Sequence, residues 1–407
     1  MSHRTLLVLS ALIIAVSIGL RQSLGLFMPP MTVELGITAA TFGFAIAVQN
    51  IVWGFAQPVV GAIADRHGPV PVLIGTALMY AAGLSLMALS KTVPGGLQIG
   101  GVLAGIGTAG TGFGVLIGTV SRATPAEKRT RTVGTVAAAA SLGTFAIAPL
   151  GQALIGSLGW KGALFAFAGL AASMAAISLG VRESHAAPAA AARASTPKLN
   201  LGDAVRQAMA HRGYLFMTLA FFACGFQLVF ITTHLPTYLA ICGVAPGVSG
   251  TALGLIGLFN AAGTYVFGRL GSRYSQKQLL AVIYLLRTMI IGVFLALPIS
   301  PSTVLVFAAA MGFLWLGVIP LVTGIIGRVF GLAHFNTLYG LVFLSHQVGS
   351  FFGAWMGGLV FTRMGNYNVA WAALIVIGLT AFTLQWMMDE RPPEEKGSGG
   401  RTVPVPA

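Results

Sequence analysis

Long apolar stretches alternate with short polar turns along almost the whole chain. Each stretch is long enough to cross a bilayer as a helix, which requires roughly 20 apolar residues. Twelve such stretches can be placed, at residues 5–29, 38–62, 70–90, 97–120, 133–157, 162–181, 213–240, 247–268, 278–298, 302–326, 336–361 and 368–388. The pattern predicts an all-α polytopic membrane protein with twelve transmembrane helices.

The longest polar interval divides the chain into two halves. Residues 182–212 separate six apolar stretches from six others. We therefore predict a six-helix bundle over 1–181, a cytoplasmic central loop over 182–212, a second six-helix bundle over 213–390 and a cytoplasmic tail over 391–407. Residues 199–211 alternate apolar and polar side chains, which is typical of a short amphipathic helix on the membrane surface and also compatible with a linker of incidental periodicity.

Both halves carry the same pattern of glycines. Six pairs share an offset of 206 or 207 residues: Gly36 with Gly243, Gly43 with Gly250, Gly61 with Gly268, Gly134 with Gly340, Gly143 with Gly349 and Gly151 with Gly357. The chain has 54 glycines, so single coincidences are expected, but a constant offset over six pairs is not. We predict two parallel six-helix pseudo-repeats, an arrangement that binds its substrate near the midplane between the halves.

The net charge of +14 would indicate nucleic-acid binding in a soluble protein. Here the basic residues are distributed unequally between the two sides. With the N-terminus in the cytoplasm, 18 of the 23 Lys and Arg residues lie on the cytoplasmic side and only Lys91, Lys161 and Arg363 lie outside. This asymmetry follows the positive-inside rule. We therefore predict that both termini are cytoplasmic in a bacterial-type inner membrane, and that the charge does not require a nucleic-acid partner.

The turn after the second stretch contains a recognisable motif. It reads Gly61-Ala-Ile-Ala-Asp65-Arg66-His67-Gly68 and resembles the G-x-x-x-D-R-x-G loop motif of the major facilitator superfamily. The resemblance implies that Asp65 pairs with a basic group of a neighbouring helix and holds an inner gate shut, while Gly61 permits close helix approach. The alternative is that Asp65 and Arg66 only cap a solvated turn. The second-half copy has lost its acid, because Ser272 occupies that position.

Two further segments are similar to the monocarboxylate porter and oxalate–formate exchanger branch of that superfamily. They are Ser23-Leu-Gly-Leu-Phe27 in the first stretch and Gly225-Phe-Gln227, followed by His234-Leu-Pro-Thr-Tyr238, in the seventh. Monocarboxylate porters also carry an Asp and an Arg in helix 8, and that Arg grips the substrate carboxylate. Asn260 and Thr264 stand at those positions here. A carboxylate-binding cation would therefore have to come from another helix.

Ionisable residues inside a membrane are costly and usually functional. All nine Asp and Glu residues lie outside the apolar stretches, whereas Arg21 and Arg287 lie within them. The interior is therefore positive, which favours an anionic substrate. Arg21 is the strongest candidate for binding a carboxylate, because a guanidinium donates two parallel hydrogen bonds to it. Alternatively, Arg21 bonds helix carbonyls or snorkels outward. Arg287 lies in a helix that is peripheral in the fold, so we favour a structural role.

Other polar and aromatic residues of the helices could complete the site. The substrate-binding candidates are Asn50, Gln227, Asn260, His346 and Tyr339, with Gln49, Gln57, Trp315 and Phe335 as further neighbours. His346 could instead accept a coupling proton, because its ordinary pKa is near 6.5. His234 lies near the external end and suits an outer gate, alongside the motif residues Asp65, Arg66, Gly61 and Gly68. Each of these residues is also compatible with a plain helix–helix contact.

Together these observations predict a secondary active transporter that moves a small organic anion, a monocarboxylate, by alternating access. Its partners would be the lipid bilayer, the anion and either protons or a counter-anion, and the protein would act as a monomer. No nucleotide-binding loop of the G-x-x-x-x-G-K-[ST] type is present, and we expect no cofactor, metal or catalytic residues. The alternative is an exporter of drugs or other amphipathic compounds with the same fold. A receptor on a transporter scaffold or a membrane enzyme is a further class.

Overall fold

The computed structural model describes residues 3–91, 93, 95–181, 201–331 and 335–391, without the side chains of helix residues 126–131, 133, 137, 201 and 336. The first half contains α1 (His3–Ser23), the 3-10 helix η1 (Leu24–Phe27), α2 (Met28–Leu35), α3 (Ala39–His67), α4 (Pro69–Ala88), α5 (Gly96–Thr111), α6 (Phe113–Arg122) and α7 (Ala126–Ser178). The second half contains α8 (Leu201–Ala210), α9 (Arg212–Ile241), α10 (Pro246–Leu270), α11 (Gln276–Ala296), α12 (Pro301–Phe313), α13 (Val318–Phe330), α14 (Phe335–Met364) and α15 (Asn368–Met387).

The helices follow the predicted stretches closely. Ten segments of the described chain are long and apolar enough to span a membrane. One of them, Gly134–Ser178, turns at Gly159, where φ is 70° and ψ is 168°, and so contains two predicted stretches. The 30-residue helix α14 coincides with a further predicted stretch. The all-α membrane fold is confirmed, and the helices are consistent with the predicted twelve.

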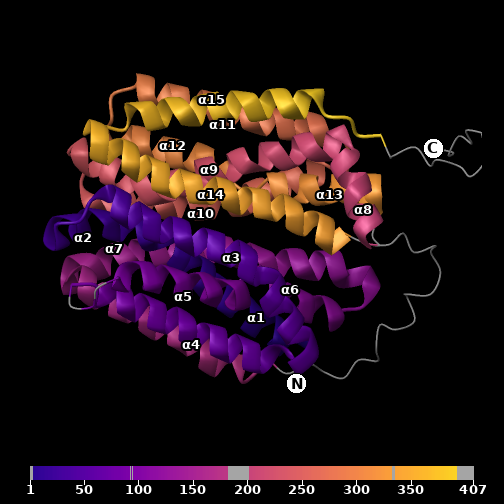
Figure 1. The fold of residues 1–407 in the computed structure, drawn as a ribbon, viewed down its shortest axis with the longest axis horizontal. Coiled ribbons are helices and arrows are strands. Elements are labelled where there is room, and N and C mark those ends of the chain that lie inside the picture. The colour runs from indigo at the N-terminus through magenta and orange to yellow at the C-terminus, as the bar shows by residue number, and fades with distance from the viewer. Residues whose placement is uncertain (1–2, 92, 94, 182–200, 332–334, 392–407) are drawn as a thin grey trace, which may run out of the picture.

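Figure 1 shows the two halves as two layers of helices. The start of α1, α8 and the end of α15 lie toward one end of the molecule, which we call the terminal end, and α2 lies at the other, which we call the far end. Helix α8 occupies the place where the sequence predicts an amphipathic helix, and its Ala204 and Ala208 are buried. Residues 182–200 of the predicted central loop, and the predicted tail beyond residue 391, lie outside the described residues.

The glycine repeat corresponds to matching contacts in the two halves. A Cβ atom at Gly143 would stand 1.9 Å from the carbonyl oxygen of Ala15 on α1, and one at Gly349 would stand 2.0 Å from that of Phe222 on α9. These pairs are related by the same offset of 206 or 207 residues. Only glycine allows backbones to approach this closely. The repeat therefore preserves equivalent helix contacts, α7 on α1 and α14 on α9.

The far end joins the halves through close backbone contacts. A Cβ at Gly43 of α3 would stand 2.4 Å from the carbonyl oxygen of Ala354 on α14, and one at Gly358 would stand 2.3 Å from that of Ala39. At the terminal end, a Cβ at Gly61, Gly134 or Gly340 would meet no described atom within 4 Å. The halves are thus packed together at the far end and not at these terminal-end positions.

Candidate functional site

Arg21 lies near the end of α1, and its guanidinium is held by α3. Its Nη1 donates to Oδ1 of Asn50 over 3.2 Å. The amide of Asn50 is oriented for this bond, because its Nδ2 donates to the carbonyl oxygen of Ile46 one turn earlier, at 2.7 Å. The guanidinium carbon lies 4.8 Å from the centre of the Trp53 ring, in a cation–π contact. Two residues of α3, three positions apart, therefore fix one cation.

Trp53 is itself anchored on a neighbouring helix. Its Nε1 donates to Oε1 of Gln57 at 2.8 Å, and Nε2 of Gln57 donates to the carbonyl oxygen of Ala109 at 3.1 Å. Ala109 lies in the last turn of α5, just before the interruption between α5 and α6. A carbonyl at a helix end lacks its intrahelical partner, and Gln57 supplies a donor to it. The indole beneath Arg21 is rigid as a result.

The guanidinium of Arg21 is incompletely bonded. Its Nε is buried and has no hydrogen-bond partner among the described residues. No ion pair of the described chain involves Arg21. An unsatisfied buried donor costs about 1–3 kcal/mol, and more when it is charged. A guanidinium in this state can donate a hydrogen bond to an external carboxylate oxygen at low cost.

The second half contributes α14 to the same place. Nε2 of Gln347 donates to the backbone oxygen of Asn50 at 3.0 Å, which links the two halves beside Arg21. Nδ1 of His346 lies 3.1 Å from Oε1 of Gln347. Because that oxygen only accepts, Nδ1 carries a proton, and the other ring nitrogen, Nε2, is not used in any described hydrogen bond. Phe343 completes the contact, with its ring 5.4 Å from that of Trp53.

Arg21, Asn50 and His346 therefore lie around one junction of α1, α3 and α14, and Tyr339 lies one helical turn from Phe343 with 6.4 Å between ring centroids. The structure does not bring Gln227 there. Nε2 of Gln227 donates to the carbonyl oxygen of Leu374 on α15, at 3.1 Å. Its side chain joins two helices of the second half.

Asn260 also lies away from Arg21. Its Nδ2 donates to Oγ of Ser141 on α7 at 2.9 Å, and its Oδ1 accepts from the backbone N–H of Leu316 at 2.9 Å. Leu316 lies in the interruption between α12 and α13. Asn260 thus supports an irregular backbone segment and connects the halves at a different pair of helices.

The predicted structural role of Arg287 matches its surroundings. Its side chain is fully buried, Nε and Nη2 donate to the carbonyl oxygen of Leu314 at 3.1 and 2.6 Å, and Nη2 also donates to that of Trp315. Nη1 lies 3.5 Å from Sγ of Cys224. The guanidinium caps the end of α12, whose last carbonyls lack helical partners.

The motif residues of the predicted gate lie at the terminal end. Asp65 forms an ion pair of 3.1 Å with Arg122 of α6, and both side chains are exposed. Gly68, with φ of 82°, ends α3 in a conformation that favours glycine, and Arg66 is exposed. The close helix approach expected at Gly61 is not present in this conformation, since a Cβ there would meet no described atom within 4 Å. The pair joins two helices of the first half only.

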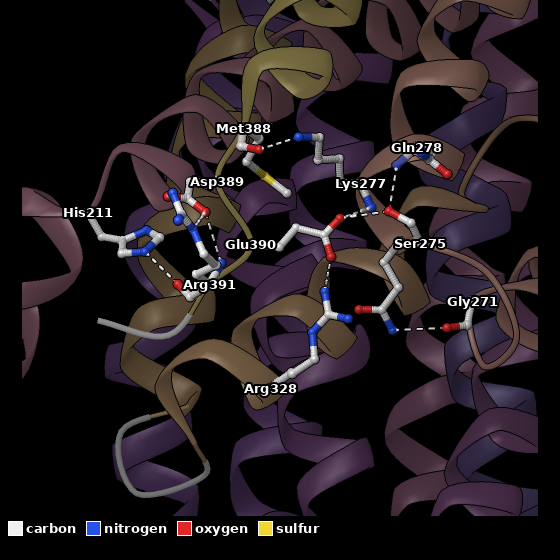
Figure 2. A network of polar contacts seen from close by, with 11 residues as sticks. His211, Gly271, Ser275, Lys277, Gln278, Arg328, Met388, Asp389, Glu390 and Arg391 are labelled. Atoms are coloured by element: carbon white, nitrogen blue, oxygen red, sulfur yellow. Dashed lines mark hydrogen bonds and ion pairs between the residues drawn. The ribbon is translucent and has the colours of Figure 1, made fainter. Parts of the chain in front are cut away.

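Figure 2 shows the corresponding region of the second half. Arg328 follows Arg122 by 206 residues and pairs with Glu390. Oε1 of Glu390 also accepts from Oγ of Ser275 at 2.7 Å and from the backbone N–H of Lys277 at 3.2 Å. The acid missing at Ser272 is thus replaced by one from the segment after α15. Nearby, hydrogen bonds from Arg391 lower the pKa of Asp389 to about 2.

His234, which the sequence predicts as an outer-gate residue, lies at the far end. Its Nε2 donates to the carbonyl oxygen of Ala354 at 2.7 Å, and its Nδ1 lies 3.1 Å from the hydroxyl of Tyr367. A carbonyl only accepts, so Nε2 is protonated, and in the neutral ring Nδ1 accepts from the tyrosine. The same Ala354 carbonyl abuts Gly43 of the other half. His234 therefore fixes the backbone that the far-end contact uses.

Sequence reasoning missed Trp53, Phe343 and Gln347 as members of the site. Trp53 stands three residues after Asn50 and therefore on the same helix face, so the polar spacing of α3 could have identified it. Gln347 follows His346 directly, and nothing in its spacing indicates that it reaches across to α3. That contact depends on how α14 packs against the other half.

Comparisons with known proteins agree with these features. The sequence matches the profile of the Major Facilitator Superfamily over residues 9–330 and 243–407. It is 25% identical to the oxalate:formate antiporter of Oxalobacter formigenes over 93% of this chain and 89% of that protein. It is 25% identical to monocarboxylate transporter 13 of Rattus norvegicus over 89% of this chain and 83% of that protein.

A solved structure has the same fold. It is a bacterial homologue of the human lysosomal transporter Spinster in an inward-facing and unoccupied conformation. The TM-score is 0.73 at 14% sequence identity, over 95% of this chain and 94% of that one. At this identity the likeness concerns the fold alone.

Proposed function

The chain belongs to the major facilitator superfamily, and on that premise we propose that it is a secondary transporter that carries a small organic anion by alternating access, with Arg21 binding the carboxylate. The relatives with the broadest coverage are an oxalate:formate antiporter and a monocarboxylate transporter, which move small organic anions and are not enzymes. The protein is a multi-pass membrane protein. We place it in the inner membrane of a bacterial cell as a monomer, with both termini cytoplasmic and with protons or a counter-anion as the coupled species.

The observation that carries this proposal is the state of Arg21. A membrane-embedded guanidinium lies between the halves with an unpartnered Nε and no described acid beside it. Asn50 and Trp53 orient it without neutralising its charge. Such a group favours a monovalent anion over a neutral or cationic compound, since a cation would need a carboxylate near Arg21.

Transport by purified protein in proteoliposomes tests the proposal. Vesicles loaded with unlabelled carboxylate should accumulate the labelled compound by exchange, for at least one member of a panel of formate, acetate, lactate, benzoate and oxalate. The Arg21→Gln protein should insert and fold but show no such uptake. The matched control is Arg363→Gln, which removes an exposed cation at the far end. If the Arg21→Gln protein exchanged the same anion at the wild-type rate, or if only amphipathic cations were carried, the drug-exporter alternative would replace this proposal.

Substitutions at the two ends of the molecule test alternating access separately. Gly43→Leu would place a side chain against the Ala354 carbonyl and should oppose far-end closure, whereas Gly61→Leu meets nothing here and should oppose closure of the terminal end. Overpacking of this kind costs about 1–3 kcal/mol, enough to shift a two-state population by about 5-fold to 150-fold. Spin-label distances across each end should therefore change in opposite directions in the two variants. Unchanged or parallel shifts would contradict alternating access.

Labelling with a membrane-impermeant thiol reagent tests the proposed orientation in the membrane. A single cysteine beside Lys91 should react from outside and one beside Lys277 only from inside, in a background without Cys224 and Cys242. Outside reaction beside Lys277 would reverse the proposed topology.

A further inference from the structure

Four rings of α14 form a continuous strip that ends beside Arg21. Phe335, Tyr339, Phe343 and His346 follow one another with ring centroids 6.2, 6.4 and 6.0 Å apart and with planes inclined by 2°, 24° and 6°. Spacings of four, four and three residues keep these rings on one side of the helix. We call these four residues the ring strip. It begins at the start of α14, at the terminal end, and reaches the level of Asn50.

The ring strip meets the first half at Trp53. The indole lies edge-on to Phe343, with 5.4 Å between centroids and 75° between planes. The guanidinium of Arg21 lies over the same ring, with its carbon 4.8 Å from the ring centre. Arg21 therefore lies beside aromatic side chains that come from both halves of the protein, Trp53 from α3 and Phe343 from α14.

Of the two arginines within the apolar stretches, Arg21 is the one whose donors are not all directed at other described groups. The donors of Arg287 are directed at the carbonyls of Leu314 and Trp315 and at the sulfur of Cys224. A dianion bound at Arg21 would have to place its second carboxylate against the rings of Trp53 and Phe343. Aromatic faces carry negative quadrupole charge and repel an anion, but they pack well against a flat apolar group.

We propose that the site selects monocarboxylates with an aryl body, such as phenylacetate, over short carboxylates and over dicarboxylates. The carboxylate binds Arg21, and the ring packs against Trp53 and Phe343, which are the specificity-determining residues. This inference rests on the proposed function and narrows its substrate class. It also separates this chain from its antiporter relative, whose name includes the dianion oxalate.

Calorimetric titration of the protein in lipid nanodiscs tests the selectivity, with phenylacetate, acetate and oxalate as probes and 2-phenylethanol as the uncharged counterpart. Phenylacetate should bind about tenfold more tightly than acetate, the size expected for one desolvated aromatic contact. Oxalate and 2-phenylethanol should bind at least as weakly as acetate. Trp53→Leu and Phe343→Leu should each move the phenylacetate-to-acetate ratio toward one. Phe382→Leu is the matched control, since that ring contacts only exposed Trp386 among the described rings, and it should retain the wild-type ratio.

Three other outcomes would overturn the inference, and they differ in whether they also contradict the proposed function. If acetate or oxalate bound as tightly as phenylacetate, and Arg21→Gln abolished that binding, the aryl selectivity would be wrong while the proposed function stood. If Trp53→Leu and Phe343→Leu both kept the full ratio, selectivity would arise elsewhere. If no carboxylate bound, or if binding did not depend on Arg21, the proposed function would fail together with the inference.

Discussion

Arg21 and Arg287 both lie within the apolar stretches of the chain, and their surroundings differ in one decisive respect. Arg287 directs donors at two backbone carbonyls and a cysteine sulfur within the second half. Arg21 donates to one side-chain oxygen, lies on an indole and leaves Nε without a described partner. Both side chains place one positive charge in an apolar environment, so the difference lies in the acceptors that surround each guanidinium.

Arg287 donates to carbonyl oxygens that lack helical partners, because the helix is interrupted between α12 and α13. The interruption between α5 and α6 lies in the matching part of the first half, but there the neutral side chain of Gln57 bonds the Ala109 carbonyl. Equivalent backbone breaks thus receive different donors. Arg21 of the first half instead contacts Asn50 and Trp53 of α3.

The largest expected effect is on stability, at Arg287. Arg287→Met should lower the free energy of unfolding by about 2–4 kcal/mol, because it leaves the Leu314 and Trp315 carbonyls buried without donors. Arg21→Met should cost less, about 1 kcal/mol, because the loss of one hydrogen bond and one cation–π contact is offset by no longer burying the unpartnered Nε. Denaturant unfolding of both variants in the same detergent compares them. Equal destabilisation would remove the distinction between the two arginines.

A smaller effect is expected at Asn50, which orients Arg21. Asn50→Ala should weaken carboxylate binding by about 0.5–1.5 kcal/mol, the usual value of one hydrogen bond, through loss of orientation. Asn260→Ala is the matched control, because Asn260 bonds Ser141 and Leu316 and not Arg21. Titration of each variant with the same carboxylate measures the change. If Asn260→Ala weakened binding more than Asn50→Ala, the assignment of the site to the residues around Arg21 would be wrong.

The smallest effect is expected from a charge outside the membrane interior. Asp65→Asn breaks an exposed ion pair with Arg122, and such pairs contribute about 0–1 kcal/mol. We expect a slight shift of the spin-label distances at the terminal end and no change in the ratio of affinities for different carboxylates. A change in that ratio would show that Asp65 also acts on the binding site.

Much of the fold could be predicted from the sequence because the bilayer imposes it. Apolar length alone located the helices, and the glycine offset revealed the repeat, since a Cβ at Gly143 or Gly349 would clash with backbone in both halves. Helix position within the family fold also gave the contrasting predictions for Arg21, a carboxylate site, and for Arg287, a structural role. These features depend on single helices or on adjacent ones.

The composition of the site was harder to predict because it depends on side-chain direction. Asn50, Gln227 and Asn260 are all buried polar residues of central helices, yet only Asn50 faces Arg21. Gln227 turns to α15, and Asn260 turns to a backbone break that the apolar pattern does not reveal. A rotation of about 100° per residue separates these faces, and periodicity in uniformly apolar helices does not specify which face meets the other half.

Carboxylate titration of wild type, Arg21→Lys and Arg287→Lys, each folded in nanodiscs, tests the central claim most directly. Lysine keeps the charge but loses the planar fork, so Arg21→Lys should weaken binding by about 1–3 kcal/mol. Arg287→Lys should lower the unfolding temperature and leave the dissociation constant of the surviving folded protein near the wild-type value. Unchanged affinity in Arg21→Lys, or a loss of affinity confined to Arg287→Lys, would contradict the assignment of the carboxylate to Arg21.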